Sequence, residues 1–294
     1  MATSAGPRRD DGPHGVLVVD KQAGWTSHDV VAKCRGIFGT RKIGHAGTLD
    51  PSATGVLVLG VGRATRLLRF VTELPKSYLG EIVFGAETST LDADGEICAR
   101  HDMSGLQASA VLAAARQFVG SIKQVPPMVS AVKVDGKRLY ALAREGKVVE
   151  RRARAVFVYR FALEPLAAES GVWRCEVDCS SGTYIRSLAA DLGAALGGGA
   201  YLRALRRVAV GDFTVEQAQS VENALLLPVS AAVAHLDYRI VSDEVAVRVG
   251  HGQVFDDDVF GDPVAGLCAV KRTDGSLLAV YAPNRNQLKP LVVL

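Results

Sequence analysis

The sequence lacks the cysteine pairs that hold metals or covalent cross-links. Its 294 residues include five cysteines, none of them in a CxxC pair, so the sequence indicates neither a zinc site nor a disulfide framework. Cys175 and Cys179 alternate with Trp173 and Val177 in VWRCEVDC. Because side chains alternate between the two faces of a strand, we predict that both are buried thiols of one strand.

Long hydrophobic runs are also missing. No stretch is apolar over the length that a bilayer-spanning helix needs. The opening MATSAGPRRDDGPHG has no apolar segment behind its two arginines, so residues 1–14 are predicted to be a flexible leader rather than a signal peptide. These features favour a cytoplasmic protein without a membrane partner.

A large surplus of charge is absent, because the formal net charge is only +3. The charge is nevertheless unevenly distributed. From Asn223 to Leu294 there are 6 Lys+Arg against 8 Asp+Glu, whereas the rest of the chain has 28 against 23. The basic excess therefore lies in the larger part, where it could meet the phosphates of a nucleic acid.

Length and composition indicate one large domain over residues 15–227 and a small β-rich domain over residues 228–294. Apolar periodicity predicts strands and helices that are mixed without regular alternation, which favours an α+β fold around a mixed sheet. Strands are expected at GVLVVDK, VLVLGVG, KSYLGEIVFG, RARAVFVYRFAL and GVWRCEVDC, helices at SHDVVAKCRGIFG, SAVLAAARQFVGSI, KRLYALAREG and SLAADLGAAL, and further β-prone segments at EVAVRVG, LCAVKRTDG and SLLAVYAP.

The segment GHAGTLDPSATG has no sustained period and is predicted to be a loop between a helix and a strand. Its glycines permit close backbone approach, Pro51 fixes the chain direction after Asp50, and its hydroxyl side chains can hydrogen-bond. On local evidence Asp50 fits an ordinary Asx turn. The second carboxylate that a glycosidase needs is not visible nearby.

Several separated segments together point to one family. DKQAGWTSHDVV (20–31), GHAGTLDPSATGVL (44–57), KSYLGEIVFGAETSTLDADGE (76–96) and SSGTYIRSLAADLG (180–193) resemble the bacterial tRNA pseudouridine synthases that modify uridine 55. The resemblance spans residues 15–225 in order, including PPMVSAVKVDGKRLYALAREG and LRRVAVGDFT. It implies a pseudouridine-synthase catalytic domain over residues 15–227 and a PUA-like C-terminal domain. It also implies an RNA-modifying isomerase that uses neither a metal nor an organic cofactor.

The resemblance implies three catalytic residues. Asp50 would act on a flipped-out uridine as a nucleophile at C1′ or C6, or as a base at the ribose, and the sequence leaves these routes open. Arg186, in GTYIRS, would pair with Asp50 and keep it ionised. Tyr78 would stack on the uracil, with its hydroxyl assisting at C5. Without the resemblance, a surface arginine would be the preferred interpretation of Arg186, and a core tyrosine would fit Tyr78 about as well.

Further residues are implied to contact the substrate or to support the site. His45 would lie against the RNA loop, Lys21 would support the catalytic loop or bind a phosphate, and Leu205 would pack under the site. Gln22 stands where the family usually has proline. The complete predicted RNA-binding set is His45, Lys21, Thr48, Tyr184, Arg151, Arg152, Arg154 and Leu205.

The implied partner is tRNA, bound through its T arm by a monomer that needs no protein partner. Two alternatives stay open. One is a non-catalytic protein that binds or folds tRNA, and the other is a related synthase that depends on a guide RNA. The lack of long basic extensions argues against the guide-dependent class. The short, slightly acidic C-terminal part argues against a role for it in binding the acceptor end.

Overall fold

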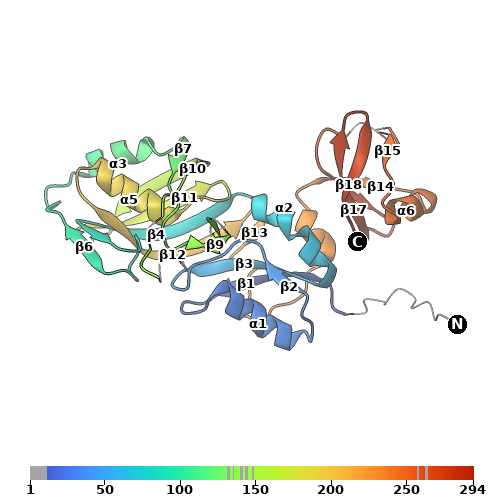
Figure 1. The fold of residues 1–294 in the computed structure, drawn as a ribbon, viewed down its shortest axis with the longest axis horizontal. Coiled ribbons are helices and arrows are strands. Elements are labelled where there is room, and N and C mark those ends of the chain that lie inside the picture. Colours follow the sequence, from blue (N-terminus) through green and yellow to red (C-terminus); the bar gives the residue numbers. More distant parts are fainter. Residues whose placement is uncertain are drawn as a thin grey trace.

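The computed structural model describes residues 12–130, 133–134, 136–139, 142, 145–147, 149–256, 258–261 and 264–294. Strands and helices build a broad main body, and a C-terminal unit lies beyond the helix α2 (Leu68–Glu73) (Figure 1). The predicted leader falls outside the described residues except at its last three positions. Within the described ranges, no helix is long and apolar enough to cross a membrane.

A nine-stranded mixed sheet forms the main body over the described residues. Every pairing in it is antiparallel except that of β3 with β12. This architecture confirms the predicted α+β class. The order is β1 (Gly15–Lys21), β3 (Thr54–Val61), β12 (Ala200–Val210), β4 (Lys76–Phe84), β11 (Val172–Cys179), β10 (Arg154–Pro165) and β7 (Gly120–Gln124), with β2 (Ile43–His45) on β3 and β13 (Phe213–Thr214) on β12.

The β1–β3 end of the sheet is buried on both faces, which explains why these strands are apolar without interruption. Leu17 and Val19 pack in the cluster under α1 (Ser27–Ile37). Val16 and Val18 point the other way, into the cluster built by Phe70 of α2 and its neighbours. The covering elements on that side are the 3-10 turn η1 (Gly62–Leu67), α2 (Leu68–Glu73) and the 3-10 turn η2 (Val229–Val233).

The other half of the sheet, from β4 to β10, packs against α3 (Ala108–Arg116) and α5 (Ile185–Ala195). Cys175 and Cys179 are 1% and 0% exposed in this core, as the alternation in β11 predicts. The prediction that α3 continues through GSI is wrong. Gly120 adopts φ +98, and the residues after it pair with β10 as the edge strand β7.

The C-terminal unit is a five-stranded sheet with one helix among the described residues. The β-prone reading of EVAVRVG is wrong, because this segment is the helix α6. Ser242 caps its first turn, and Ala246 and Val249, three residues apart, face the core. The elements are β14 (Asp237–Ile240), α6 (Asp243–Gly250), β15 (Phe255–Asp256), β16 (Cys268–Lys271), β17 (Leu277–Asn284) and β18 (Gln287–Val293).

Two small hairpins complete the described elements. The turn region after β4 carries β5 (Ala86–Thr88) and β6 (Ile97–Arg100). β8 (Lys133–Val134) pairs with β9 (Lys137–Arg138), so the predicted helix KRLYALAREG begins instead in a strand. The remainder of that segment is described in part: Leu139 and Leu142 are helical, and residues 140–141 and 143–144 lie outside the described residues.

Candidate active site

The loop that carries Asp50 runs from the end of β2 to the start of β3 and is held by side chains from two earlier elements. Ser27, at the start of α1, bonds both backbone groups of Leu49, with its Oγ 2.9 Å from Leu49 N and 3.3 Å from Leu49 O. Lys21 is 0% exposed, and its Nζ donates to the Pro51 and Trp25 carbonyls at 3.1 and 2.6 Å. Lys21 therefore supports the loop geometrically and is not a solvated lysine.

Arg207 of β12 holds the same loop from the other side. Its Nη2 donates to Gly47 O at 3.1 Å and its Nε to Val56 O at 2.7 Å, and the residue is 1% exposed. The backbones of Gly55 and Arg207 are in close contact. A Cβ added to Gly55, where φ is +101, would lie 2.1 Å from Arg207 O. Only glycine fits this junction between β3 and β12.

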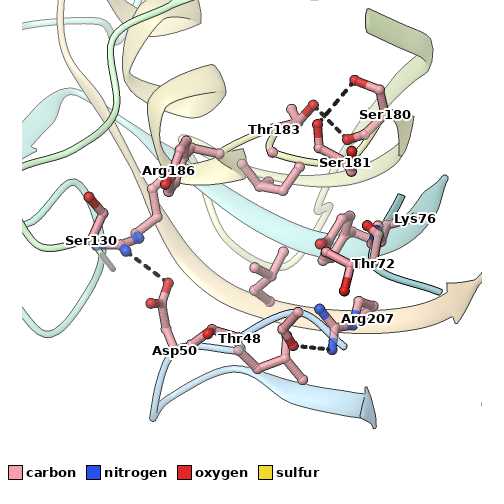
Figure 2. Close-up of a pocket in the computed structure, with 17 residues that line it drawn as sticks. Thr48, Asp50, Thr72, Lys76, Ser130, Ser180, Ser181, Thr183, Arg186 and Arg207 are labelled. Carbon is pink, nitrogen blue, oxygen red and sulfur yellow. Dashed lines mark hydrogen bonds and ion pairs between the residues drawn. The ribbon is translucent and has the colours of Figure 1, made fainter. Parts of the chain in front are cut away.

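Asp50 faces Arg186 across the cavity mouth (Figure 2). Asp50 Oδ2 lies 2.9 Å from Arg186 Nη2. The guanidinium is fixed on its other edges, since Nη1 lies 3.2 Å from Asp92 Oδ2 and also donates to Thr90 O, while Nη2 donates to Val129 O. With 4% of its surface exposed, Arg186 is a rigid cation rather than a surface arginine.

Burial raises the pKa of the Asp50 carboxyl above its ordinary value. The Arg186 cation lowers this pKa, and the carboxylates of Asp92 and Asp94 raise it again, so loss of hydration outweighs the ion pair. A carboxylate in such a setting is poorly hydrated when ionised, which increases its reactivity as a base or nucleophile.

A cavity of about 260 Å³ opens between this ion pair and strands β4 and β12. That volume is at the lower end of the roughly 300–1,000 Å³ typical of small-molecule sites, so it suits one nucleotide. Burial raises the pKa of the Tyr78 hydroxyl, which keeps it protonated as a donor; the neighbouring Arg207 acts in the opposite direction. The lining residues are Gly47, Thr48, Leu49, Asp50, Thr72, Lys76, Tyr78, Ser130, Ser180, Ser181, Gly182, Thr183, Tyr184, Ile185, Arg186, Leu205 and Arg207.

Six of the predicted site residues line this cavity: Thr48, Asp50, Tyr78, Tyr184, Arg186 and Leu205. His45 precedes it in β2, with its ring 5.4 Å from that of His28 in an edge contact. Arg152 and Arg154 are exposed near the start of β10. Arg151 is partly buried, and its Nη1 donates to Pro126 O at 3.0 Å. Its side chain therefore contacts the protein's own backbone.

Three charged residues of the site were not predicted. Arg207 and Lys76 line the cavity, and Asp92 fixes Arg186. A signal for the first two was present, because residues two apart on a strand share a face. Arg207 follows Leu205 by two positions, and Lys76 precedes Tyr78 by two. Asp92 lies in the polar turn TLDADGE, where no periodicity distinguishes it from Asp94.

No cluster of three or more His, Cys, Asp or Glu side chains suited to a metal ion occurs in the part of the chain that the structure describes. The polar groups of the cavity are one carboxylate, three cations, two phenols and several hydroxyls. Such a set can orient a neutral nucleoside, hold a carboxylate against it and stabilise negative charge.

Comparison with known proteins gives consistent matches. Residues 35–185 match the model of the TruB family pseudouridylate synthase N-terminal domain, and residues 186–246 match that of the tRNA pseudouridylate synthase B C-terminal domain. Among solved structures, a chain of a Cbf5-Nop10-Gar1 complex superposes with a TM-score of 0.72. It covers 99% of this chain and 91% of that chain at 24% identity, which shows a shared fold.

Curated relatives match over most of the chain. The tRNA pseudouridine synthase B of Thermobifida fusca is 47% identical over 290 residues, which cover 95% of this chain and 98% of the relative. That of Mycobacterium avium is 54% identical over 218 residues, covering 74% and 71%. The protein is thus an enzyme of the pseudouridine synthase type, and the chain belongs to the TruB family of pseudouridylate synthases.

Proposed function

We propose that this protein converts uridine 55 in the T loop of tRNA to pseudouridine, with Asp50 as the catalytic carboxylate. The observation that carries the proposal is the Asp50–Arg186 ion pair at the edge of a nucleotide-sized cavity that Tyr78 also lines. The tRNA substrate is supported by the names of the relatives that match over most of the chain.

The reaction is an isomerisation. The bond between C1′ and N1 of the uridine breaks, the uracil turns, and a bond between C1′ and C5 forms. The C5 proton leaves and a ring nitrogen takes one up, so no oxidant, reductant or nucleotide triphosphate is consumed. Asp50 acts at C1′, at C6 or at a ribose proton. Tyr78 covers the base and its hydroxyl assists at C5, since its raised pKa keeps it protonated.

The target uridine enters the cavity as a flipped nucleotide. A uridine stacked in a folded loop does not present C1′ or C5 to a carboxylate, so it must leave the stack. His45 ends strand β2, and Thr48 lies in the loop that carries Asp50. Both would contact the RNA loop around the flipped base. Arg152 and Arg154, both exposed, would contact phosphates. We propose that a monomer does this without a protein partner.

The direct test is modification of an unmodified tRNA transcript by the purified chain, with no guide RNA or other protein added. We expect one new pseudouridine, at position 55, and none in a transcript that carries cytidine there. Tight tRNA binding without modification would support the non-catalytic alternative. Modification only when a guide RNA is supplied would support the guide-dependent class.

A further inference from the structure

Three lysine and arginine side chains around the site are buried without an ion pair among the described residues. Lys21, Lys76 and Arg207 are 0%, 6% and 1% exposed. Within the described ranges, none of them lies within 4.0 Å of a carboxylate oxygen, whereas Arg186 has two such contacts. Buried charges in proteins are normally paired, because an uncompensated one is costly. This surplus calls for a functional explanation.

Two of these cations face the cavity. Lys76 and Arg207 line it beside Tyr78, on the side away from Asp50 and Arg186 (Figure 2). The strand register places them together, because Arg207 of β12 lies opposite Tyr78 of β4, two positions from Lys76. Burial above all, and the neighbouring Arg207 cation after it, lower the pKa of Lys76 to about 8, while Cys179 and the exposed Glu73 act in the opposite direction. The two positive charges are therefore close enough to repel.

Both cations are held firmly in place. Lys76 Nζ donates to the carbonyls of Thr72 and Leu74 at the end of α2, which leaves one of its three N–H groups for the cavity. Arg207 uses Nε and Nη2 on Val56 and Gly47, and its guanidinium also interacts with the Tyr78 hydroxyl in the cavity. Its Nη1 lies beside Gly47, another lining residue, 3.5 Å from where a Cβ would stand.

We propose that Lys76 and Arg207 stabilise the negative charge that the uracil acquires when its bond to C1′ breaks. The electron pair of that bond goes to N1 and spreads to O2 and O4. The charge disappears again when C5 bonds to C1′, after which the C5 proton leaves and N1 takes one up. A neutral uridine needs no such cations. Fixed donors of this kind interact with the negative charge only as it develops on the uracil. They therefore lower the activation barrier without strengthening the binding of the neutral uridine.

The inference rests on the proposed function and is tested through Lys76, because loss of Arg207 would also release the Asp50 loop. Lys76→Met removes the charge and Lys76→Arg retains it. Each variant is assayed in single-turnover reactions with a T-arm RNA carrying either uridine or 5-fluorouridine at the target. Fluorine at C5 makes the uracil a weaker base and a better leaving group. Loss of the N1-linked nucleoside after digestion is the readout for both RNAs.

We expect Lys76→Met to slow the uridine reaction about 10²-fold, the size typical of losing one donor to a developing charge. The loss on 5-fluorouridine should be several-fold smaller, and Lys76→Arg should recover most of the rate. RNA affinity and the unfolding temperature should change little. Lys33→Met, at an exposed lysine of α1, is the matched control and should behave as wild type.

Equal losses on the two RNAs would overturn the inference, since a purely structural lysine would slow both alike. A loss confined to RNA affinity would also overturn it and would make Lys76 a ground-state phosphate contact. Failure of the wild-type chain to modify uridine in either RNA is a different outcome. It would contradict the proposed function itself.

Discussion

At Asp50, burial and the neighbouring Arg186 cation act in opposite directions on one carboxyl group. Burial has the larger effect, so the pKa of Asp50 is raised. Two more carboxylates, on Asp92 and Asp94, raise it further. The ion pair with Arg186 therefore serves less to lower the pKa than to keep the carboxylate fixed toward the cavity.

This pKa shift predicts the acid side of the rate profile. The role proposed for Asp50 requires its ionised form, so the single-turnover rate should fall as the pH drops through a pKa higher than the 3.8 of a free aspartate. Asp94→Asn removes an exposed carboxylate that raises this pKa, so it should move the acid limb to lower pH. Asp102→Asn, at an exposed aspartate that does not contribute to the shift, should leave the limb in place. An Asp94→Asn profile that coincides with wild type would contradict this account.

At the scale of single residues, the sequence supports predictions only where a pattern surrounds the residue. Asp50, Tyr78 and Arg186 come from motifs, and the structure brings all three to one cavity. Asp92 belongs to the site because its Oδ2 lies 3.2 Å from Arg186 Nη1. The two residues are 94 positions apart in the sequence. No local pattern encodes such a contact. The roles assigned to these residues stay predictions until they are tested.

Among the elements, the junction of β3 with β12 positions the loop that carries Asp50. It is the one parallel pairing of the main sheet over the described residues, and it spans just two residue pairs, Arg206 with Thr54 and Arg207 with Gly55. Arg206 also reaches past β3 to Asp20, with Nη1–Oδ1 and Nη2–Oδ2 distances of 3.0 and 2.8 Å. These contacts join β1 to β12 and set the Asp50 loop against the cavity.

The junction makes a clear prediction for Gly55→Ala. The new Cβ would meet Arg207 O at 2.1 Å and would stand on a backbone with φ +101. We expect a loss of about 3 kcal/mol or more in the free energy of unfolding, from strain and the steric clash together. Gly36→Ala in α1, where nothing lies within 4 Å of the added Cβ, should be neutral or slightly stabilising. Denaturant unfolding of both variants measures this, and equal stabilities would refute the role given to the junction.

Secondary-structure elements were predictable where one periodicity dominates. β1, β4, β10, β11 and α5 follow their apolar patterns. α6 was missed because its three valines alternate as in a strand, while the residues that face the core, Ala246 and Val249, are three apart. The end of α3 was missed because the pairing of β7 with β10 is a tertiary contact that overrides local helix propensity.

For the whole molecule, the C-terminal unit contributes to the core of the main body. Ala269, Val280 and Val292 share a buried cluster with Val16 and Phe70. The small β-rich unit expected from the composition is present. Its boundary at residue 228 stays a prediction, as does the absence of a role in tRNA binding.

The uneven charge of the chain predicts how RNA binding depends on salt. Each phosphate contact adds about 0.7–0.9 to the slope of log affinity against log salt. The double variant Arg152→Ala, Arg154→Ala should therefore lower the slope by about 1.5 and weaken binding at low salt. Lys289→Ala, at an exposed lysine of β18 in the acidic C-terminal part, should leave the slope unchanged. Equal slopes for all three proteins would place the phosphate contacts elsewhere.

The most direct test of the central claim is the Asp50→Asn variant with unmodified tRNA. Because the folded-state pKa of Asp50 is raised, its ionised form disfavours folding at neutral pH, so the variant should be at least as stable as wild type. We expect tRNA binding to persist while pseudouridine at position 55, mapped nucleotide by nucleotide, falls by at least about 10³-fold. Undiminished pseudouridine at position 55 would contradict the assignment of Asp50 as the catalytic carboxylate.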